Sequence, residues 1–283
     1  MSKHRVSIII VTCNSLPALE DSLARLKQLH KNTGFELIVV DNNSSDQSIS
    51  RVRSYFSAAR IMEMNENVGF AAACNQAAWV ASGEFLLFHN PDLVLDEGAI
   101  ERLLGTWQSR DRVGAVTGRM RFPDGSFQAT CRQFPSPGNI VFSRGSVFTR
   151  LFGNRGKYTL EDFAEVTEVP SVAGTLLAVK KDLFMALGGF DECFFMYMED
   201  TDLCLRLNRA GYINYFVPGA GGVHLWGKGS RGGKLKRNWY HHISFWKYFR
   251  KHFPGTASLF IMPLVLGIHL VLASLLGRPV ARN

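Results

Sequence analysis

Three long apolar runs constrain the fold of this chain more than any other feature of its sequence. They are VSIIIV at 6–11, ELIVVD at 36–41 and EFLLFHN at 84–90. Runs that do not alternate with polar residues are typical of strands buried on both faces of a sheet. The intervening segments predict a short strand at 60–64 and helices at 16–29, about 47–56 and 70–82. The alternation of strands and helices predicts an α/β fold with a mainly parallel central sheet flanked by helices.

Composition agrees with one large globular domain followed by a short appendage. The chain has 283 residues, of which 46% are hydrophobic and 20% charged, which is enough for a full core and argues against a disordered protein. Its five cysteines lack CxxC spacing, so they indicate neither a zinc site nor a disulfide framework. The sequence suggests one boundary, near Pro254 and Gly255, where an apolar tail begins.

Polar residues cluster where the predicted strands end. The clusters are TCNS at 12–15, DNNSSD at 41–46, NENVGF at 65–70 and NPD at 90–92. Each alone could be an ordinary turn or helix cap, but ligands of open parallel sheets bind at the carboxyl ends of strands. The first strand is not followed by GxGxxG, and the chain has no GxxxxGK[ST]. A dinucleotide site is therefore disfavoured and a P-loop is excluded.

Six motifs in this order resemble the inverting glycosyltransferases of family 2. They are SIIIVTCNS, VVDNNSSD, NVGFAAACNQ, NPD, GGFDECFFMYMEDTDLCLR and GVHLWG. The resemblance covers about residues 5–252 and is strongest to the rhamnosyltransferase-like branch that elongates polyprenyl-linked cell-surface glycans. It implies a GT-A fold over 1–253, with a nucleotide-binding half of about 1–120 and an acceptor half of about 121–253.

The resemblance also implies a reaction. We expect transfer of L-rhamnose from dTDP-rhamnose to a polyprenyl-diphosphate-linked saccharide in cell-wall or O-antigen polysaccharide synthesis. One alternative is a UDP-sugar transferase of the same fold, for galactofuranose or another hexose. Another is a catalytically silent module that binds a sugar nucleotide or a lipid. No nucleic-acid-binding motif accompanies the basic residues, so we expect no nucleic-acid partner.

A divalent-ion site is implied at the NPD motif. Asp92 matches a metal-binding carboxylate of the family, and His224 matches a histidine placed on the metal or the diphosphate. Oxygen ligands of this kind suit Mg²⁺ or Mn²⁺. Asn90 replaces the first carboxylate of the usual Asp-x-Asp, which should weaken the affinity for the metal. The alternatives are a helix-capping role for Asp92 and a structural role for His224.

Further positions match the family's contacts to the nucleotide sugar. They are Thr12, Asn14, Asp41, Asn67, Gly69 and Asn75. Among them, Asp41 corresponds to the acidic residue that pairs with the pyrimidine ring, and Gly69 lets the backbone pass close to the ligand. Lys228 and Arg231 could form a clamp on the diphosphate, with a solvated basic loop as the alternative.

The catalytic residue is expected in YMEDTDLCLR at 197–206. An inverting transfer needs one carboxylate base aimed at the acceptor hydroxyl, and the resemblance assigns this role to Asp200. Glu199 and Asp202 would orient the acceptor or the helix. Three neighbouring acids raise one another's proton affinity, although acids in a first helical turn also complement the helix dipole.

The C-terminal third is basic and predicts a membrane partner. Residues 203–283 contain 12 of the 32 Lys and Arg residues and no Asp or Glu. Aromatic residues mixed with these charges over 238–253 predict an interfacial helix facing anionic headgroups. The cations suited to headgroups are Lys234, Lys236, Arg237, Lys247, Arg250 and Lys251.

The tail at 254–283 is expected to associate with the same membrane. Residues 256–277 carry no charge over 22 positions, long enough to cross a bilayer, although Pro263 and His269 favour a kinked or re-entrant segment. A buried helix of the domain is the alternative. The flanking basic residues predict attachment at the cytoplasmic face of the inner (plasma) membrane, where a lipid-linked acceptor would be found.

Overall fold

The computed structural model describes residues 5–136, 159–225 and 234–255, together with five positions between 263 and 271. The first elements in chain order are β1 (Val6–Thr12), α1 (Ala18–Thr33), β2 (Glu36–Asp41), α2 (Ser48–Tyr55), β3 (Arg60–Glu63), α3 (Phe70–Val80), β4 (Phe85–His89), β5 (Leu93–Leu95) and α4 (Ala99–Ser109). The later elements are β6 (Val113–Arg121), β7 (Phe127–Gln128), β8 (Cys131–Arg132), β9 (Thr167–Val169), β10 (Ser171–Val172), β11 (Leu176–Lys180), α7 (Lys181–Ala186), α8 (Glu199–Arg209), β12 (Ile213–His224) and α9 (Lys234–His252). The predicted strands and helices of the first 90 residues are all present.

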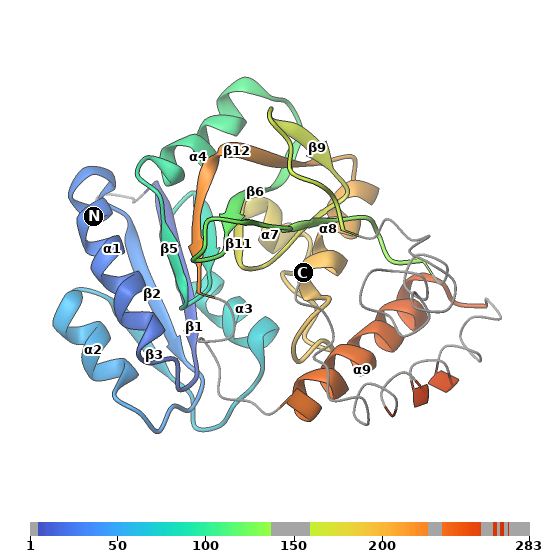
Figure 1. The fold of residues 1–283 in the computed structure, drawn as a ribbon, viewed down its shortest axis with the longest axis horizontal. Coiled ribbons are helices and arrows are strands. Elements are labelled where there is room, and N and C mark those ends of the chain that lie inside the picture. Colours follow the sequence, from blue (N-terminus) through green and yellow to red (C-terminus); the bar gives the residue numbers. More distant parts are fainter. Residues whose placement is uncertain are drawn as a thin grey trace.

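A ten-stranded mixed sheet forms the centre of the described part of the chain (Figure 1). Its main path is β3-β2-β1-β4-β11-β6-β12-β5. The neighbours from β3 to β4 are parallel, as predicted, and β12 is parallel to β6. Strand β11 runs antiparallel between β4 and β6, so the sheet is mostly rather than wholly parallel. Because β11 starts opposite His89, the residues that precede it lie at the carboxyl end of β4.

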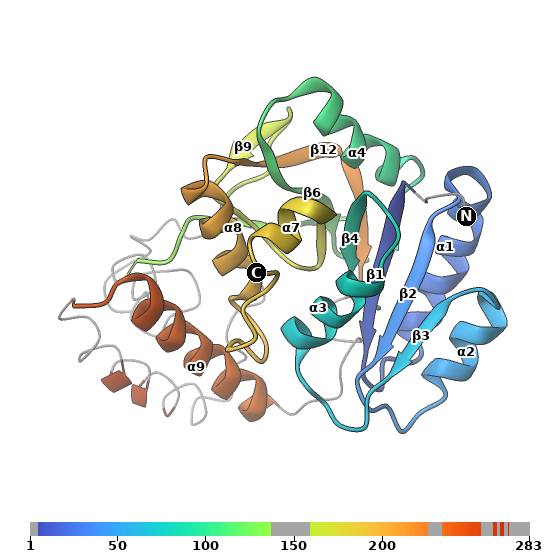
Figure 2. The ribbon, with the colours of Figure 1, turned by 180° about the vertical axis from the view of Figure 1, so that it is seen from behind.

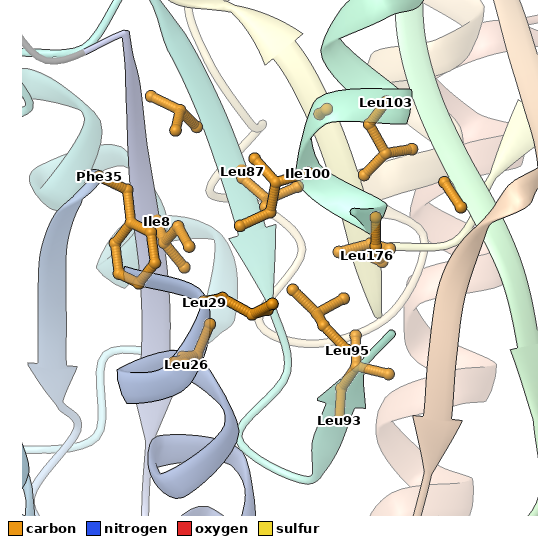
Figure 3. Packing of buried hydrophobic residues seen from close by; sticks show 14 of the residues in the cluster. Ile8, Leu26, Leu29, Phe35, Leu87, Leu93, Leu95, Ile100, Leu103 and Leu176 are labelled. Carbon is orange, nitrogen blue, oxygen red and sulfur yellow. The ribbon is translucent and has the colours of Figure 1, made fainter. Parts of the chain in front are cut away.

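Each face of the sheet has its own hydrophobic layer. Ile8 and Ile10 of β1 pack with α1, α2 and α4 on one face, whereas Ile9 packs with α3, α7 and α8 on the other. Figures 1 and 2 show these two helical layers from opposite sides. Figure 3 shows the first layer, where Leu26 of α1 lies among side chains of several strands. Strands covered on both faces explain the continuous apolar runs of the sequence.

Helix α9 is attached to the domain through apolar contacts. Its buried side chains Phe245, Tyr248 and Phe249 pack with Phe194 and Leu205, next to α8. The predicted helix at 238–253 is therefore present, starting four residues earlier, and one of its faces is buried in the domain rather than turned to solvent.

A buried charge network also ties α9 to α8. Asp202 is fully buried, and its carboxylate accepts hydrogen bonds from Arg206, Lys251 and His252, each at 2.7 Å. Lys247 donates to the carbonyl of Cys193 (2.6 Å). We expected Lys247 and Lys251 to contact lipid headgroups. In the structure both ammonium groups donate hydrogen bonds to groups of the protein itself.

The apolar tail lies mostly outside the described residues. The positions that the structure describes between 263 and 271 are helical, and Leu264, Ile268 and Val271 are exposed. Among the described residues, no helix is both long and apolar enough to cross a membrane.

His89 at the end of β4 is an unusual residue for a sheet core. It is 2% exposed, and neither ring nitrogen has a hydrogen-bond partner in the described part of the chain. Burial lowers the pKa of His89 from 6.5 to about 4, although the charge of Asp92 opposes this change. The buried imidazole is therefore neutral at physiological pH.

We predict that His89 makes the folded state less stable in mild acid. The unfolded chain binds a proton near pH 6.5 and the folded chain only near pH 4, so stability falls as the pH drops through this window. The full loss is about 3 kcal/mol. Thermal unfolding of His89→Leu should depend less on pH between 4 and 6.5 than that of the wild type. Equal slopes in the two proteins would contradict the assignment.

Candidate active site

The ends of β1 and β2 present two buried side chains with unused hydrogen-bonding capacity. Thr12 and Asp41 are neighbours in the parallel register, and the N–H of Asn42 donates to the carbonyl of Thr12 (2.8 Å). Asp41 Oδ2 accepts the N–H of Ser44 (3.2 Å), but Asp41 Oδ1 and Thr12 Oγ1 have no partner among the described residues. Unsatisfied buried polar atoms are uncommon in folded proteins and point to a functional site.

Asn42 organises the loops at this edge, although sequence reasoning did not single it out. Its Nδ2 donates to Asn67 Oδ1 (2.9 Å) and to the carbonyl of Gly69 (3.2 Å), and its Oδ1 accepts the N–H of Val68 (2.9 Å). One buried amide thus ties the end of β2 to the loop before α3. The sequence offered one indication of a role for Asn42, its position directly after Asp41. Asparagine is common in turns, so this position alone did not distinguish it from an ordinary turn residue.

The predicted contacts Asn14 and Asn67 both shape the loops around the nucleotide position. Asn14 Oδ1 accepts the N–H groups of Ser45 (2.8 Å) and Asp46 (3.1 Å). Asn67 Oδ1 accepts the N–H of Gly69 (3.0 Å), and its Nδ2 lies 3.5 Å from the Cys13 sulfur. The structure brings these residues together at the ends of β1 and β2, and their contact with a nucleotide remains a prediction.

Gly69 makes a close backbone contact that requires glycine. Its φ is +88°, and a Cβ at this position would lie 2.6 Å from the carbonyl oxygen of Phe195. The next residue, Phe70, donates its N–H to the same oxygen (2.9 Å). We expected Gly69 to make room for a ligand, and the structure shows that it makes room for the loop that precedes α8. This contact joins the loop before α3 to the segment before α8.

Asn75 lies in a different environment from the strand-end residues. Its Nδ2 donates to the carbonyl of Phe190 (2.8 Å) and to Glu192 (2.9 Å), and its Oδ1 accepts the N–H of Phe190 (2.9 Å). The amide is therefore engaged in holding the segment before α8. A contact with the ribose or the diphosphate remains a prediction, as it does for Lys228 and Arg231, which lie outside the described residues.

Asp92 and His224 face each other at the end of the sheet. β12 pairs with β5, which places His224 opposite Leu93, and the N–H of Leu225 donates to the carbonyl of Asp92 (2.9 Å). His224 Nε2 lies 3.0 Å from Asp92 Oδ1, and both side chains are buried. Gln128 Oε1 lies 3.1 Å from His224 Nδ1 and can only accept a hydrogen bond, so Nδ1 is the donor in this contact. The other ring nitrogen, Nε2, faces the Asp92 carboxylate.

This pair suits a cation. An imidazole nitrogen and a carboxylate oxygen are both ligands that a divalent ion accepts. Two adjacent ligands of an octahedral ion with bonds of about 2.1 Å lie about 3 Å apart, which is close to the 3.0 Å between these atoms. No group of three His, Cys, Asp or Glu in the described residues could hold a metal. Two protein ligands are sufficient where substrate phosphates complete the coordination.

Asp200 is positioned by the backbone at the start of α8. Its Oδ2 accepts the N–H of Gly174 (2.8 Å), and its Oδ1 accepts the N–H and the hydroxyl of Thr201 (2.6 and 3.1 Å). Gly174 lies just before β11, and the carbonyl of the next residue, Thr175, accepts the N–H of Asn90 (3.0 Å). A short backbone path therefore connects Asp200 to the Asn-Pro-Asp motif.

The other two acids of α8 have opposite environments. Burial, reinforced by the charge of Asp200, raises the pKa of Glu199 well above its usual value, and Glu199 Oε2 has no hydrogen-bond partner among the described residues. Burial would also raise the pKa of Asp202, but the hydrogen bond from His252 and the charge of Arg206 lower it. Burial thus favours the protonated form of Glu199, whereas the groups around Asp202 favour its ionised form, which holds α9.

These groups converge on one edge of the sheet. The loops with Asn14 and Asn42 follow β1 and β2, Asp92 follows β4 and His224 ends β12. Asp200 accepts a hydrogen bond from the segment just before β11. Ligands of α/β sheets bind at this edge. The mixed sheet between two helical layers, with polar loops at this edge, is the fold of the GT-A class of glycosyltransferases.

Comparison with known proteins identifies the family. The sequence profile of Glycosyl transferase family 2 matches residues 7–188, and the chain belongs to this family. It is 31% identical over 237 residues to an N-acetylglucosaminyl-diphospho-decaprenol L-rhamnosyltransferase of Mycobacterium tuberculosis, covering 77% of this chain and 75% of that protein. It is 30% identical over 145 residues to the rhamnosyltransferase WbbL of Escherichia coli, covering 51% of this chain and 53% of that protein.

A solved structure supports the fold assignment. The mannosyltransferase of Pyrobaculum calidifontis, in complex with GDP-Man and Mn²⁺, superimposes with a TM-score of 0.59 at 20% sequence identity. The alignment covers 98% of this chain and 77% of that one. The GT-A fold predicted from the sequence motifs is confirmed.

Proposed function

We propose that this chain is an inverting rhamnosyltransferase. It would transfer L-rhamnose from dTDP-rhamnose to a polyprenyl-diphosphate-linked saccharide in the synthesis of a cell-wall or O-antigen polysaccharide. The observation that carries the proposal is the backbone path from Asp200 through Gly174 and Thr175 to Asn90, which connects the proposed base to the Asn-Pro-Asp motif. The name of the mycobacterial relative supports the choice of sugar and of acceptor.

The chemistry follows from the positions of these residues. Asp200 would accept the proton of an acceptor hydroxyl while the hydroxyl oxygen attacks the anomeric carbon. The bond from that carbon to the diphosphate breaks, and its electron pair remains on the phosphate oxygen. Asp92 and His224 would hold Mg²⁺ or Mn²⁺, which supplies positive charge against the diphosphate. Thr12 Oγ1 and Asp41 Oδ1, which have no partner among the described residues, would form hydrogen bonds with the donor nucleotide.

Neutral Glu199 would have a supporting role beside the base. A second ionised carboxylate next to Asp200 would repel the negative charge of an acceptor diphosphate and alter the proton affinity of the base. Burial raises the pKa of Glu199, and the protonated form that this favours would avoid the repulsion. Asp202 would affect the reaction only by fixing the position of α9, because its carboxylate already accepts hydrogen bonds from three side chains.

A panel of nucleotide sugars tests the proposed reaction. The acceptor is polyprenyl-diphosphate N-acetylglucosamine in detergent, and the measurement is sugar transfer with Mn²⁺, with Mg²⁺ and with EDTA. We expect turnover with dTDP-rhamnose that EDTA abolishes. Turnover with a UDP-sugar alone would replace the donor and keep the mechanism. Binding of a donor without transfer to any acceptor would favour a silent sugar-nucleotide module.

Substitution of the α8 acids separates the base from its neighbour. Asp200→Asn should lower kcat by about 10²- to 10⁴-fold, the usual contribution of a general base, with donor affinity nearly intact. Glu199→Gln resembles the protonated acid that the structure indicates, so it should cost less than about tenfold. The measurements are steady-state kinetics and calorimetric donor binding. A larger loss of kcat in Glu199→Gln than in Asp200→Asn would make Glu199 the base and Asp200 the supporting residue.

We further propose that the enzyme works at an anionic membrane surface, on the cytoplasmic face of the inner (plasma) membrane. Trp239 of α9 is 52% exposed, and Arg250 lies over the ring of Trp246 at 5.4 Å. The exposed side chains of Leu264, Ile268 and Val271 recur at helical spacing. Aromatic, basic and apolar groups of this kind suit a bilayer interface.

Vesicle binding tests this surface. Trp239→Ala should weaken binding to vesicles that contain anionic phospholipid by about fivefold, because an indole that is partly buried in lipid contributes about 1 kcal/mol. Trp79→Ala is the matched control, since Trp79 is 73% exposed on α3. Equal effects of the two substitutions in a flotation assay would remove Trp239 from the membrane contact.

A further inference from the structure

The segment at 191–198 leads directly into the acidic start of α8 and ends in an uncommon backbone conformation. Tyr197 and Met198 have φ of +70° and +72°, although neither is glycine. Left-handed backbone is unfavourable for residues with a Cβ, and it persists where the surrounding contacts enforce it. Because Glu199 and Asp200 follow immediately, the contacts that enforce this conformation also set the first turn of α8.

Helix α9 lies along this segment, and Figures 1 and 2 show the two next to each other. The residues of α9 that contact it recur every three or four positions and are Tyr240, Ser244, Lys247 and Lys251. Residues at this spacing share one face of a helix. At one end of the contact, Lys251 Nζ lies 2.6 Å from the carboxylate of Asp191, and at the other the ring of Tyr240 stacks on Phe195 at 4.7 Å. One face of α9 therefore follows the segment toward α8.

Two of these contacts hold the backbone of the segment. Lys247 Nζ donates to the carbonyl of Cys193 (2.6 Å). The hydroxyl of Ser244 donates to the carbonyl of Met196 (2.8 Å), and Ser244 is only 3% exposed. A segment without strand or helix hydrogen bonds has carbonyls that other groups must satisfy. Ser244 satisfies the carbonyl directly before Tyr197, the first of the two residues with positive φ.

Helix α3 holds an earlier part of the same segment. The N–H of Phe70 donates to the carbonyl of Phe195 (2.9 Å), and Asn75 forms hydrogen bonds with both backbone groups of Phe190 (2.8 and 2.9 Å). These contacts are made before Met196. The hydrogen bond from Ser244 of α9 is thus the nearer one to the start of α8.

We propose that Ser244 and Lys247 are positioning residues for Asp200. By holding two backbone carbonyls of the segment, they enforce the conformation at Tyr197 and Met198 and so fix the direction in which α8 begins. This inference rests on the proposed function for the role of Asp200 as the base. A catalytic group displaced by about 1 Å can cost about 10²-fold in rate, so contacts that do not touch the substrate can change kcat.

Single substitutions test the two contacts. Ser244→Ala and Lys247→Gln should each lower kcat by about tenfold, because the base is then poorly placed in the transition state. Calorimetric binding of dTDP with Mn²⁺ and the KM of dTDP-rhamnose should remain at the wild-type values. Ser244→Thr and Lys247→Arg keep a hydrogen-bond donor, so they should retain most of kcat. Wild-type kcat in both Ser244→Ala and Lys247→Gln would overturn the inference.

The Asp200→Asn background distinguishes positioning of the base from a general structural role. If Ser244 acts through Asp200, Ser244→Ala should lower the residual transfer of Asp200→Asn by less than about twofold. A general structural role would lower it as much as in the wild type. A further fall of about tenfold would therefore contradict the assignment.

Two substitutions elsewhere serve as matched controls. Ser54 of α2 donates its hydroxyl to the carbonyl of Arg51 (2.8 Å), and Lys181 of α7 donates to the carbonyl of Ala81 (2.5 Å). Ser54→Ala and Lys181→Gln remove the same kinds of hydrogen bond, and both should leave kcat unchanged. Losses of kcat as large in these controls as in the α9 variants would also overturn the inference.

Hydrogen exchange separates failure of this inference from failure of the proposed function. Ser244→Ala should speed exchange of the backbone amides at 197–202 by about tenfold and leave those of β1 and β2 unchanged. If the wild type transfers no sugar but exchange rises in this way, the proposed reaction is wrong and the role of Ser244 in holding the segment stands. If transfer occurs and neither kcat nor exchange changes, the reaction stands and the positioning role is wrong. Absence of transfer together with unchanged exchange would overturn both.

Discussion

Parallel pairing of β1 with β2 and β4 is the constraint on which the rest of the site depends. Parallel strands end at the same edge of a sheet, so Thr12, Asp41 and the residues after His89 must lie near one another. Backbone amides beyond those ends no longer have ladder partners, and the loops satisfy them with side chains such as Asn14 and Asn42. The same loops therefore shape the edge at which we propose that the nucleotide binds.

Antiparallel β11 adds the acceptor side to this edge. Because β11 starts where β4 ends, Gly174 and Thr175 lie between Asp200 and Asn90. A parallel strand at this place would have brought its other end here and carried Gly174 to the opposite edge. The mixed sheet is thus the feature that connects Asp200 to the edge where Asp92 and His224 lie.

Helix α9 is held by both apolar and ionic contacts. A fully buried Asp202 would be costly alone, but Arg206, Lys251 and His252 surround it and favour its ionised form. Removal of one member would leave uncompensated charge inside the protein, so the network fixes one position of α9. That position sets Tyr240 on Phe195, in the segment that precedes α8.

The sequence by itself determined the fold class, the strands and helices up to β4, and the motifs that identify the family, because apolar periodicity and strand-end chemistry are local properties. It also indicated Asp92, His224 and Asp200 through those motifs. Only the tertiary structure decided that burial raises the pKa of Glu199, that Asn42 joins two loops, that Gly69 meets Phe195, and that Lys251 faces a carboxylate instead of lipid. These outcomes depend on burial and on partners distant in the chain, and neither quantity is present in the local pattern of residues.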